Sequence, residues 1–120
     1  MSALIDTLTT APAGSDDLDE QAALALGFLP VRADRLSQWW YHPRNPSSLC
    51  RVERFTTDLN ATFAEAQRRG WRIVVDTDKA PNKPQAAIWD NRAKGWKTAV
   101  RAATPALAAC AALIAAVEAG

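Results

Sequence analysis

The last seventeen residues, 104–120, read TPALAACAALIAAVEAG and decide the fold. Thr104 offers a side-chain oxygen to the free N–H groups of a helix start, and Pro105 suits the first helical position. Larger apolar residues interrupt the alanines at helical spacing and form one stripe, made by Leu107, Cys110, Ile114 and Val117. Side chains this small let a helix lie close against the element that it covers, and we expect that element to be a sheet.

Two further helices are predicted upstream. Residues 16–26 begin with acidic side chains that complement the helix dipole, and Gly27 stands where the helix would end. Residues 59–69 follow the capping oxygens of residues 56–58, and Gly70 stands at their end. Both segments carry apolar residues on one face, so each is expected to pack against the rest of the domain.

Strands are predicted where aromatic and β-branched residues gather between turn residues. The predicted strands are residues 39–42, 49–52, 71–76, 85–90 and 96–101. We expect residues 28–38 to be a connection, residues 43–48 a turn and residues 1–15 a flexible, loosely held tail. Strands grouped together and flanked by helices describe one α+β domain over residues 16–120, a small antiparallel sheet with helices packed against it.

The last predicted strand shows the alternation of a sheet most clearly. Its residues form two sets, Trp96, Thr98 and Val100 against Lys97, Ala99 and Arg101. We therefore expect one buried and one wet face in this part of the sheet.

The composition favours a cytoplasmic protein with reduced thiols. The formal net charge is +1, although the eleven Lys and Arg of residues 51–101 outnumber the six acids of that segment. Two cysteines sixty positions apart are typical of cytosolic thiols, and Asp6 in a segment without basic residues argues against a signal peptide. The apolar run near the C-terminus covers about twelve residues, short of the roughly 18–20 of a membrane helix. We expect no membrane partner.

Several short motifs recur in an order that resembles a known family. They are AALALGF at 22–28, WYHP at 40–43, FTTDLNATF at 55–63, GW at 70–71 and ATPALAACAAL at 103–113. Over about residues 18–118 this arrangement resembles the phage ABA sandwich domain family, small proteins encoded by phages and prophages. Phe28 stands where the family commonly has Trp, and Pro105 follows Thr104 without the usual intervening Ala. The resemblance implies an α-β-α layered fold and a phage or prophage origin, and it implies no catalytic residues.

Catalytic and metal-binding patterns are scarce in this sequence. His42 is the single histidine, and with Cys50 it forms the one arrangement that offers a thiol nucleophile and a base, because a predicted hairpin joins them. Cys110 lies among alanines, where a thiol behaves as a small buried hydrophobe. The sequence has no Cys-x-x-Cys pair, no paired histidines, no calcium loop and no Gly-rich phosphate loop. We predict a protein that is not an enzyme and that needs no metal or cofactor.

Tryptophan and basic residues supply the candidate binding surface. Trp39 and Trp40 are neighbours on a strand and point to opposite faces, so one of the two rings is expected at the rim or exposed. An exposed Trp beside Arg is a common composition of interface hot spots. The candidate partner-binding residues are Trp39, Arg68, Arg69, Arg72, Arg92, Lys94, Trp96 and Lys97.

Two functions of different kinds fit these residues. The first is a phage or prophage accessory protein that binds a host or phage protein, for example to inhibit a host defence complex as anti-CRISPR proteins do. The alternative is a small nucleic-acid-binding module whose Arg, Lys and Trp side chains meet phosphates and bases. An enzyme built on Cys50 and His42 is a third reading, and a homodimer through a sheet edge or the alanine-rich helix stays open.

Overall fold

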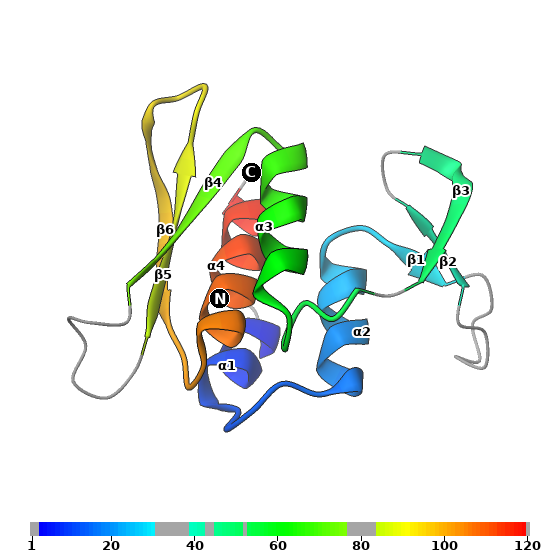
Figure 1. Ribbon diagram of the computed structural model, residues 1–120, viewed down its shortest axis with the longest axis horizontal. Helices are drawn as coiled ribbons and strands as arrows, with labels where there is room; N and C mark the ends of the chain where they lie inside the picture. Colours follow the sequence, from blue (N-terminus) through cyan, green and yellow to red (C-terminus); the bar gives the residue numbers. More distant parts are fainter. Residues whose placement is uncertain (1–2, 31–38, 43–44, 52, 77–83, 120) are drawn as a thin grey trace.

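Figure 1 shows the computed structural model, in which the described residues are 3–30, 39–42, 45–51, 53–76 and 84–119. For residues 30, 39, 42 and 45–51 the description covers the backbone alone. The helices in this part of the chain are α1 (Ala3–Thr10), α2 (Asp16–Ala25), α3 (Leu59–Arg68) and α4 (Pro105–Ala119). The strands are β1 (Leu29–Pro30), β2 (Trp39–His42), β3 (Asn45–Arg51), β4 (Trp71–Asp76), β5 (Gln85–Asp90) and β6 (Gly95–Arg101).

Two antiparallel sheets lie on either side of the helices. One has the strand order β1–β2–β3 and the other β4–β5–β6. In Figure 1, α1, α3 and α4 lie beside one face of the β4–β6 sheet, and α2 stands between them and the β1–β3 sheet. The predicted class, α+β with helices packed against a small antiparallel sheet, is confirmed. The layers follow the order sheet, helices, sheet, which differs from the α-β-α order that the resemblance implies.

Helix α4 forms the centre of the core, as its alanines predict. Thr104 caps it by accepting a hydrogen bond from the N–H of Leu107 at 3.1 Å. Ten of its fifteen residues are buried, and it packs against β5, β6, α1 and α3. Thr98 of β6 reaches the backbone of this helix and donates to the carbonyl of Ala112 at 2.8 Å. The helix is thus covered on all sides along most of its length, rather than on the single predicted stripe.

The N-terminal segment belongs to the packed domain, contrary to the tail that we expected over residues 1–15. Residues Ala3–Thr10 form α1, which packs on α4 and buries Leu8 completely. An eight-residue helix is marginal on its own, so its contact with α4 stabilises it. Further along, Gly14 lies so close to the backbone of Thr56 that a Cβ at residue 14 would stand 2.2 Å from the Thr56 carbonyl oxygen.

The same contact continues into a buried polar cluster. Ser15 caps α2 by accepting from the N–H of Leu18, and its own N–H donates to the hydroxyl of Thr56. The buried carboxylate of Asp19 accepts from both the N–H and the hydroxyl of Thr56. These bonds fasten the start of α2 to the loop before α3 and satisfy a carboxylate that burial would otherwise destabilise.

The β1–β3 sheet departs from the sequence prediction in two places. Strand β3 begins at Asn45, within the predicted turn, and β1 lies within the segment that we expected to be a connection. Pairing with β2 defines both segments: Leu29 and Pro30 pair with Tyr41 and Trp40, and Asn45 pairs with His42 beside a shift in register. Residues 31–38 and 43–44 of these predicted segments lie outside the described residues. Apart from α1, the other described elements end within about two residues of their predicted bounds.

Candidate functional site

The β4–β6 sheet has one covered and one open face. Ile73, Ile88 and Thr98 align across its three strands on the face that α4 covers. The opposite face, called the outer face below, consists of three cross-strand rows, Arg72–Trp89–Trp96, Val74–Ala87–Ala99 and Asp76–Gln85–Arg101. On this face Trp96 is 60% exposed and Val74 is 41% exposed, so its aromatic and apolar groups are available to a partner.

A β-bulge places Trp96 on the outer face. Ile88 pairs with Thr98, whereas the next residue of β5, Trp89, pairs with Trp96, so Lys97 is the extra residue of the bulge. Uninterrupted alternation would have placed Trp96 on the same face as Thr98, and the bulge reverses this expectation. The rings of Trp89 and Trp96 meet edge to face, with centroids 5.0 Å apart and an angle of 77° between their planes. Trp89 was not among the residues predicted for the site.

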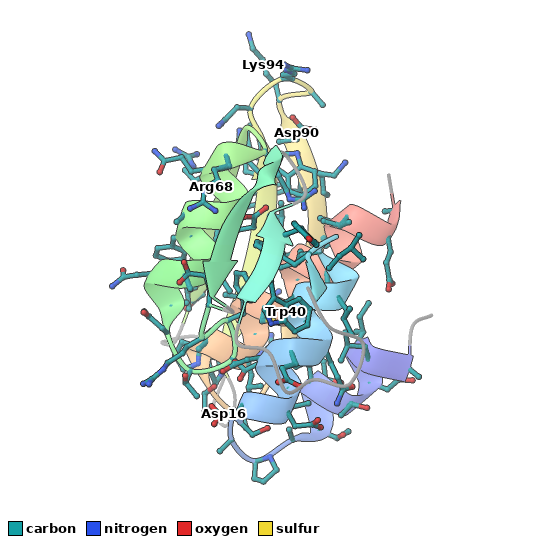
Figure 2. All side chains as sticks on the ribbon, turned by 90° about the vertical axis from the view of Figure 1, so that its right-hand side faces the viewer. Asp16, Trp40, Arg68, Asp90 and Lys94 are labelled. Atoms are coloured by element: carbon teal, nitrogen blue, oxygen red, sulfur yellow. The ribbon has the colours of Figure 1, made fainter. Side chains whose placement is uncertain are left out.

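Basic side chains gather where α3 ends and where β4 and β6 begin. Figure 2 shows Lys94 at the tip of this end, with Asp90 and Arg68 in the same part of the molecule and Asp16 at the opposite end. The cations of this region, called the basic end below, are Arg68, Arg69, Arg72, Arg92, Lys94 and Lys97. The structure therefore brings seven of the eight candidate residues to one end of the sheet, the six cations and Trp96.

Arg68 and Arg69 are held by a buried carboxylate. Glu65 of α3 is fully buried, and its two oxygens each lie 3.0 Å from a guanidinium nitrogen, one of Arg68 and one of Arg69. Arg69 also donates to the carbonyl of Leu26 at 2.8 Å, which ties the end of α3 to the end of α2. Because these bonds neutralise a buried charge, both arginines have a structural role at the basic end.

Lys97 and Asp90 stabilise the turn between β5 and β6. The N–H groups of Ala93 and Arg92 donate to Asp90, and the bond from Ala93 is the main cause that lowers the pKa of this carboxyl. Lys97 Nζ lies 3.9 Å from Asp90 Oδ2 and 5.2 Å from the centre of the Trp71 ring. Within the described part of the chain, Arg72, Arg92 and Lys94 form no ion pair.

A groove of about 260 Å³ opens beside β4. Its lining comes from α3, β4 and the β5–β6 turn and consists of Phe63, Gln67, Trp71, Arg72, Ile73 and Asn91. Phe63 is 38% exposed although it lies on a packed helix. Arg72 belongs both to the groove and to the outer face, so the two surfaces are continuous. A second hollow, of about 430 Å³ near the starts of α3 and α4, has no charged side chain among its lining residues.

Of the two cysteines, Cys110 is the one whose side chain the structure describes. Cys110 is buried in α4, and burial, followed by the charge of Asp19, raises the pKa of its thiol to about 12. A thiol that stays protonated is a poor nucleophile. Only the backbone is described for Cys50 and His42, the pair considered for catalysis, and for Trp39. Its neighbour Trp40 is buried in the core.

The described residues contain neither a metal-binding cluster nor a membrane-spanning helix. No group of three or more His, Cys, Asp or Glu side chains is placed there to hold a metal ion. None of the helices in these ranges has the length and apolar character to cross a membrane.

No protein-family model, no curated protein and no solved structure matches this chain. The resemblance to the phage ABA sandwich domain family therefore stays a prediction from the motifs.

Proposed function

We propose that this protein acts without catalysis, by binding a macromolecular partner through the outer face and the basic end. The observation that carries the proposal is Trp96, which is 60% exposed and packed edge to face against Trp89. Arg72 of β4 pairs directly with Trp89 of β5, in the same row of the outer face. Trp and Arg are the residue types that dominate interface energies, and a rigid pair of indoles offers a large contact area at little entropic cost.

The titratable groups of the basic end support binding rather than catalysis. Glu65 pairs with Arg68 and Arg69, and Asp90 is engaged by backbone N–H groups and lies near Lys97. Each of these carboxylates therefore has a structural task. Arg72, Arg92 and Lys94 are the cations of this end that are left to meet a partner.

A protein is the first class of partner that we propose. The apolar row of Val74, Ala87 and Ala99 beside the two Trp rings has the composition of an interface centre, with charged residues on either side. If the phage resemblance holds, the partner is a host or phage protein, and inhibition of a host defence complex is one form of this function. The alternative is a nucleic acid, which the excess of cations beside an exposed Trp favours.

Affinity capture from a lysate of the natural host tests this proposal. We expect the wild-type chain to retain a specific protein that Trp96→Ala fails to retain. Leu29→Ala is the matched control, because Leu29 is equally exposed, at 60%, but lies on the other sheet. Equal capture by all three chains would contradict a site on the outer face. Binding of single-stranded or duplex oligonucleotides that weakens steeply with added salt would favour the nucleic-acid alternative.

A further inference from the structure

We infer that the groove beside β4 takes an extended segment of an acidic protein partner, which adds as a strand to the edge of the sheet. One carboxylate side chain of this segment meets Arg72, and a neighbouring apolar side chain packs against Phe63 and Trp71. The inference rests on the proposed function, since it specifies the chemistry of the partner for a surface continuous with the outer face.

The backbone of β4 presents open hydrogen-bonding groups to the groove. Within the described residues β4 is an edge strand that pairs with β5 alone. The N–H of Asn91 donates to the carbonyl of Gly70 at 3.2 Å, and the register continues from there without a shift. Because hydrogen-bonded and non-bonded pairs alternate in an antiparallel ladder, Arg72 and Val74 bond to β5, and the backbone groups of Ile73 point to the open edge. A peptide strand can pair with them.

The side chains of the groove match the two faces of an added strand. Successive residues of an extended peptide point to opposite faces. A residue on the covered side would meet Phe63, Trp71 and Ile73, which form the apolar wall. Its neighbour would emerge beside Arg72, where a guanidinium can bind a carboxylate through two hydrogen bonds. The amides of Gln67 and Asn91 complete the lining.

The size of the groove suits a side chain better than a separate small molecule. Its volume of about 260 Å³ lies below the roughly 300–1,000 Å³ of most small-molecule pockets. One apolar side chain and one carboxylate fill such a space. The ligand is therefore expected to be held by its backbone along β4 and selected by two of its side chains.

The distribution of charge favours an acidic protein over a nucleic acid. Arg72, Arg92 and Lys94 are the cations of the basic end that form no ion pair among the described residues, and the nearby carboxylates Glu65 and Asp90 are already engaged. These cations, with the one positive charge that Glu65 leaves on Arg68 and Arg69, neutralise about four phosphates, too few for strong binding to a nucleic-acid backbone. They are enough to select a short acidic segment and to reject a basic one.

The probe for this site is a capped peptide, acetyl-Thr-Val-Glu-Val-Thr-amide, titrated into the full chain labelled with nitrogen-15. We expect amide resonances of Trp71 and Ile73 and the side-chain amides of Gln67 and Asn91 to shift as the peptide binds. The same peptide with Gln in place of Glu should bind about tenfold more weakly, because it loses a charge-assisted hydrogen bond. Protection of the Ile73 amide from hydrogen exchange would report the added strand.

Two exposed arginines of one sheet face provide the matched variants. Arg72→Gln should abolish the preference for the Glu peptide, whereas Arg101→Gln removes the same charge from the far row and should leave the preference unchanged. Phe63→Ala should weaken both peptides alike, since it removes the apolar wall and leaves the cation.

Several results would overturn the inference. They are equal binding of the Glu and Gln peptides, shifts confined to Trp89 and Trp96, and no binding at millimolar peptide. A single-stranded oligothymidylate that shifts the groove resonances at lower concentration than the peptide would also overturn it, and would support the nucleic-acid alternative. If the peptide does not bind while capture still depends on Trp96, the groove inference is wrong and the outer-face proposal stands. If the peptide binds and capture does not depend on Trp96, the outer-face proposal is wrong and the groove inference stands.

Discussion

The two faces of the β4–β6 sheet are built from alternate residues of the same strands, yet their properties are opposite. The covered face places Ile73 and Ile88 in the core beneath α4, a helix made mostly of alanine. The outer face carries the rings of Trp89 and Trp96 beside a row of small apolar side chains. An alanine-rich helix packs too close to the sheet to leave depth for an indole at its centre. In this sheet, therefore, the largest side chains of β5 and β6 mark the surface rather than the core.

The largest expected effect contrasts one residue from each face. Ile88→Ala should lower the free energy of unfolding by about 2–5 kcal/mol, because it opens a cavity at a fully buried position. Val74→Ala, on the outer face of the same sheet, should change it by about 0.5 kcal/mol or less. Urea denaturation followed by circular dichroism measures both values. Similar losses for the two variants would show that the outer face is covered after all.

A second pair adds volume instead of removing it. Ala112 of α4 is fully buried, and Ala112→Leu should cost about 1–3 kcal/mol because the core has no room for the added methylenes. Ala99→Leu makes the same change on the exposed outer face and should alter stability by about 0.5 kcal/mol or less. The midpoint of the same denaturation curve reports the difference. A neutral Ala112→Leu would mean that α4 packs more loosely than its burial indicates.

The smallest expected effect on stability concerns the thiol of Cys110. Its pKa is raised to about 12 from an ordinary 9.0, so above pH 9 the unfolded chain loses a proton that the folded chain keeps. The free energy of unfolding is therefore unaffected by the titration of this thiol below pH 9. Between pH 9 and the raised pKa it falls by at most about 1.4 kcal/mol per pH unit. Denaturation at pH 8 and pH 10 should show this loss in the wild type and a smaller loss in Cys110→Ala.

Alkylation offers a direct comparison of the two faces at pH 8. Iodoacetamide should leave Cys110 unmodified in the folded protein and modify it in urea. Ala99→Cys places a thiol on the outer face, where it should react readily without denaturant. Mass spectrometry of the separate peptides distinguishes these sites. Equal rates in the folded state would contradict the burial of α4.

Local signals predicted most of the elements. Capping groups and terminal glycines predicted the helices around Leu18 and Phe63, and β-branched residues predicted strand β4. The exceptions depend on contacts between elements. Helix α1 is stabilised by its packing on α4, and β1 forms by pairing with β2. Local composition does not show either contact.

The candidate site was predictable as a set of residues but not as a surface. Composition indicated Arg72 and Trp96, whereas their common row with Trp89 follows from the register of three strands. The bulge at Lys97 depends on pairing and turned Trp96 away from its expected face. Glu65 has the i, i+3 and i, i+4 spacing of helix ion pairs with Arg68 and Arg69, but the sequence could not show that its carboxylate is fully buried.

Gly14 bears on how this chain can change over evolutionary time. Any other residue at this position would push a Cβ against the carbonyl of Thr56, at a contact that joins segments 42 positions apart. Homologues that keep the fold should therefore retain glycine at this position. They should also retain the helix cap at Ser15 and the Asp19 carboxylate, which accepts a hydrogen bond from Thr56. These four residues would identify a remote relative even when the overall sequence identity is low.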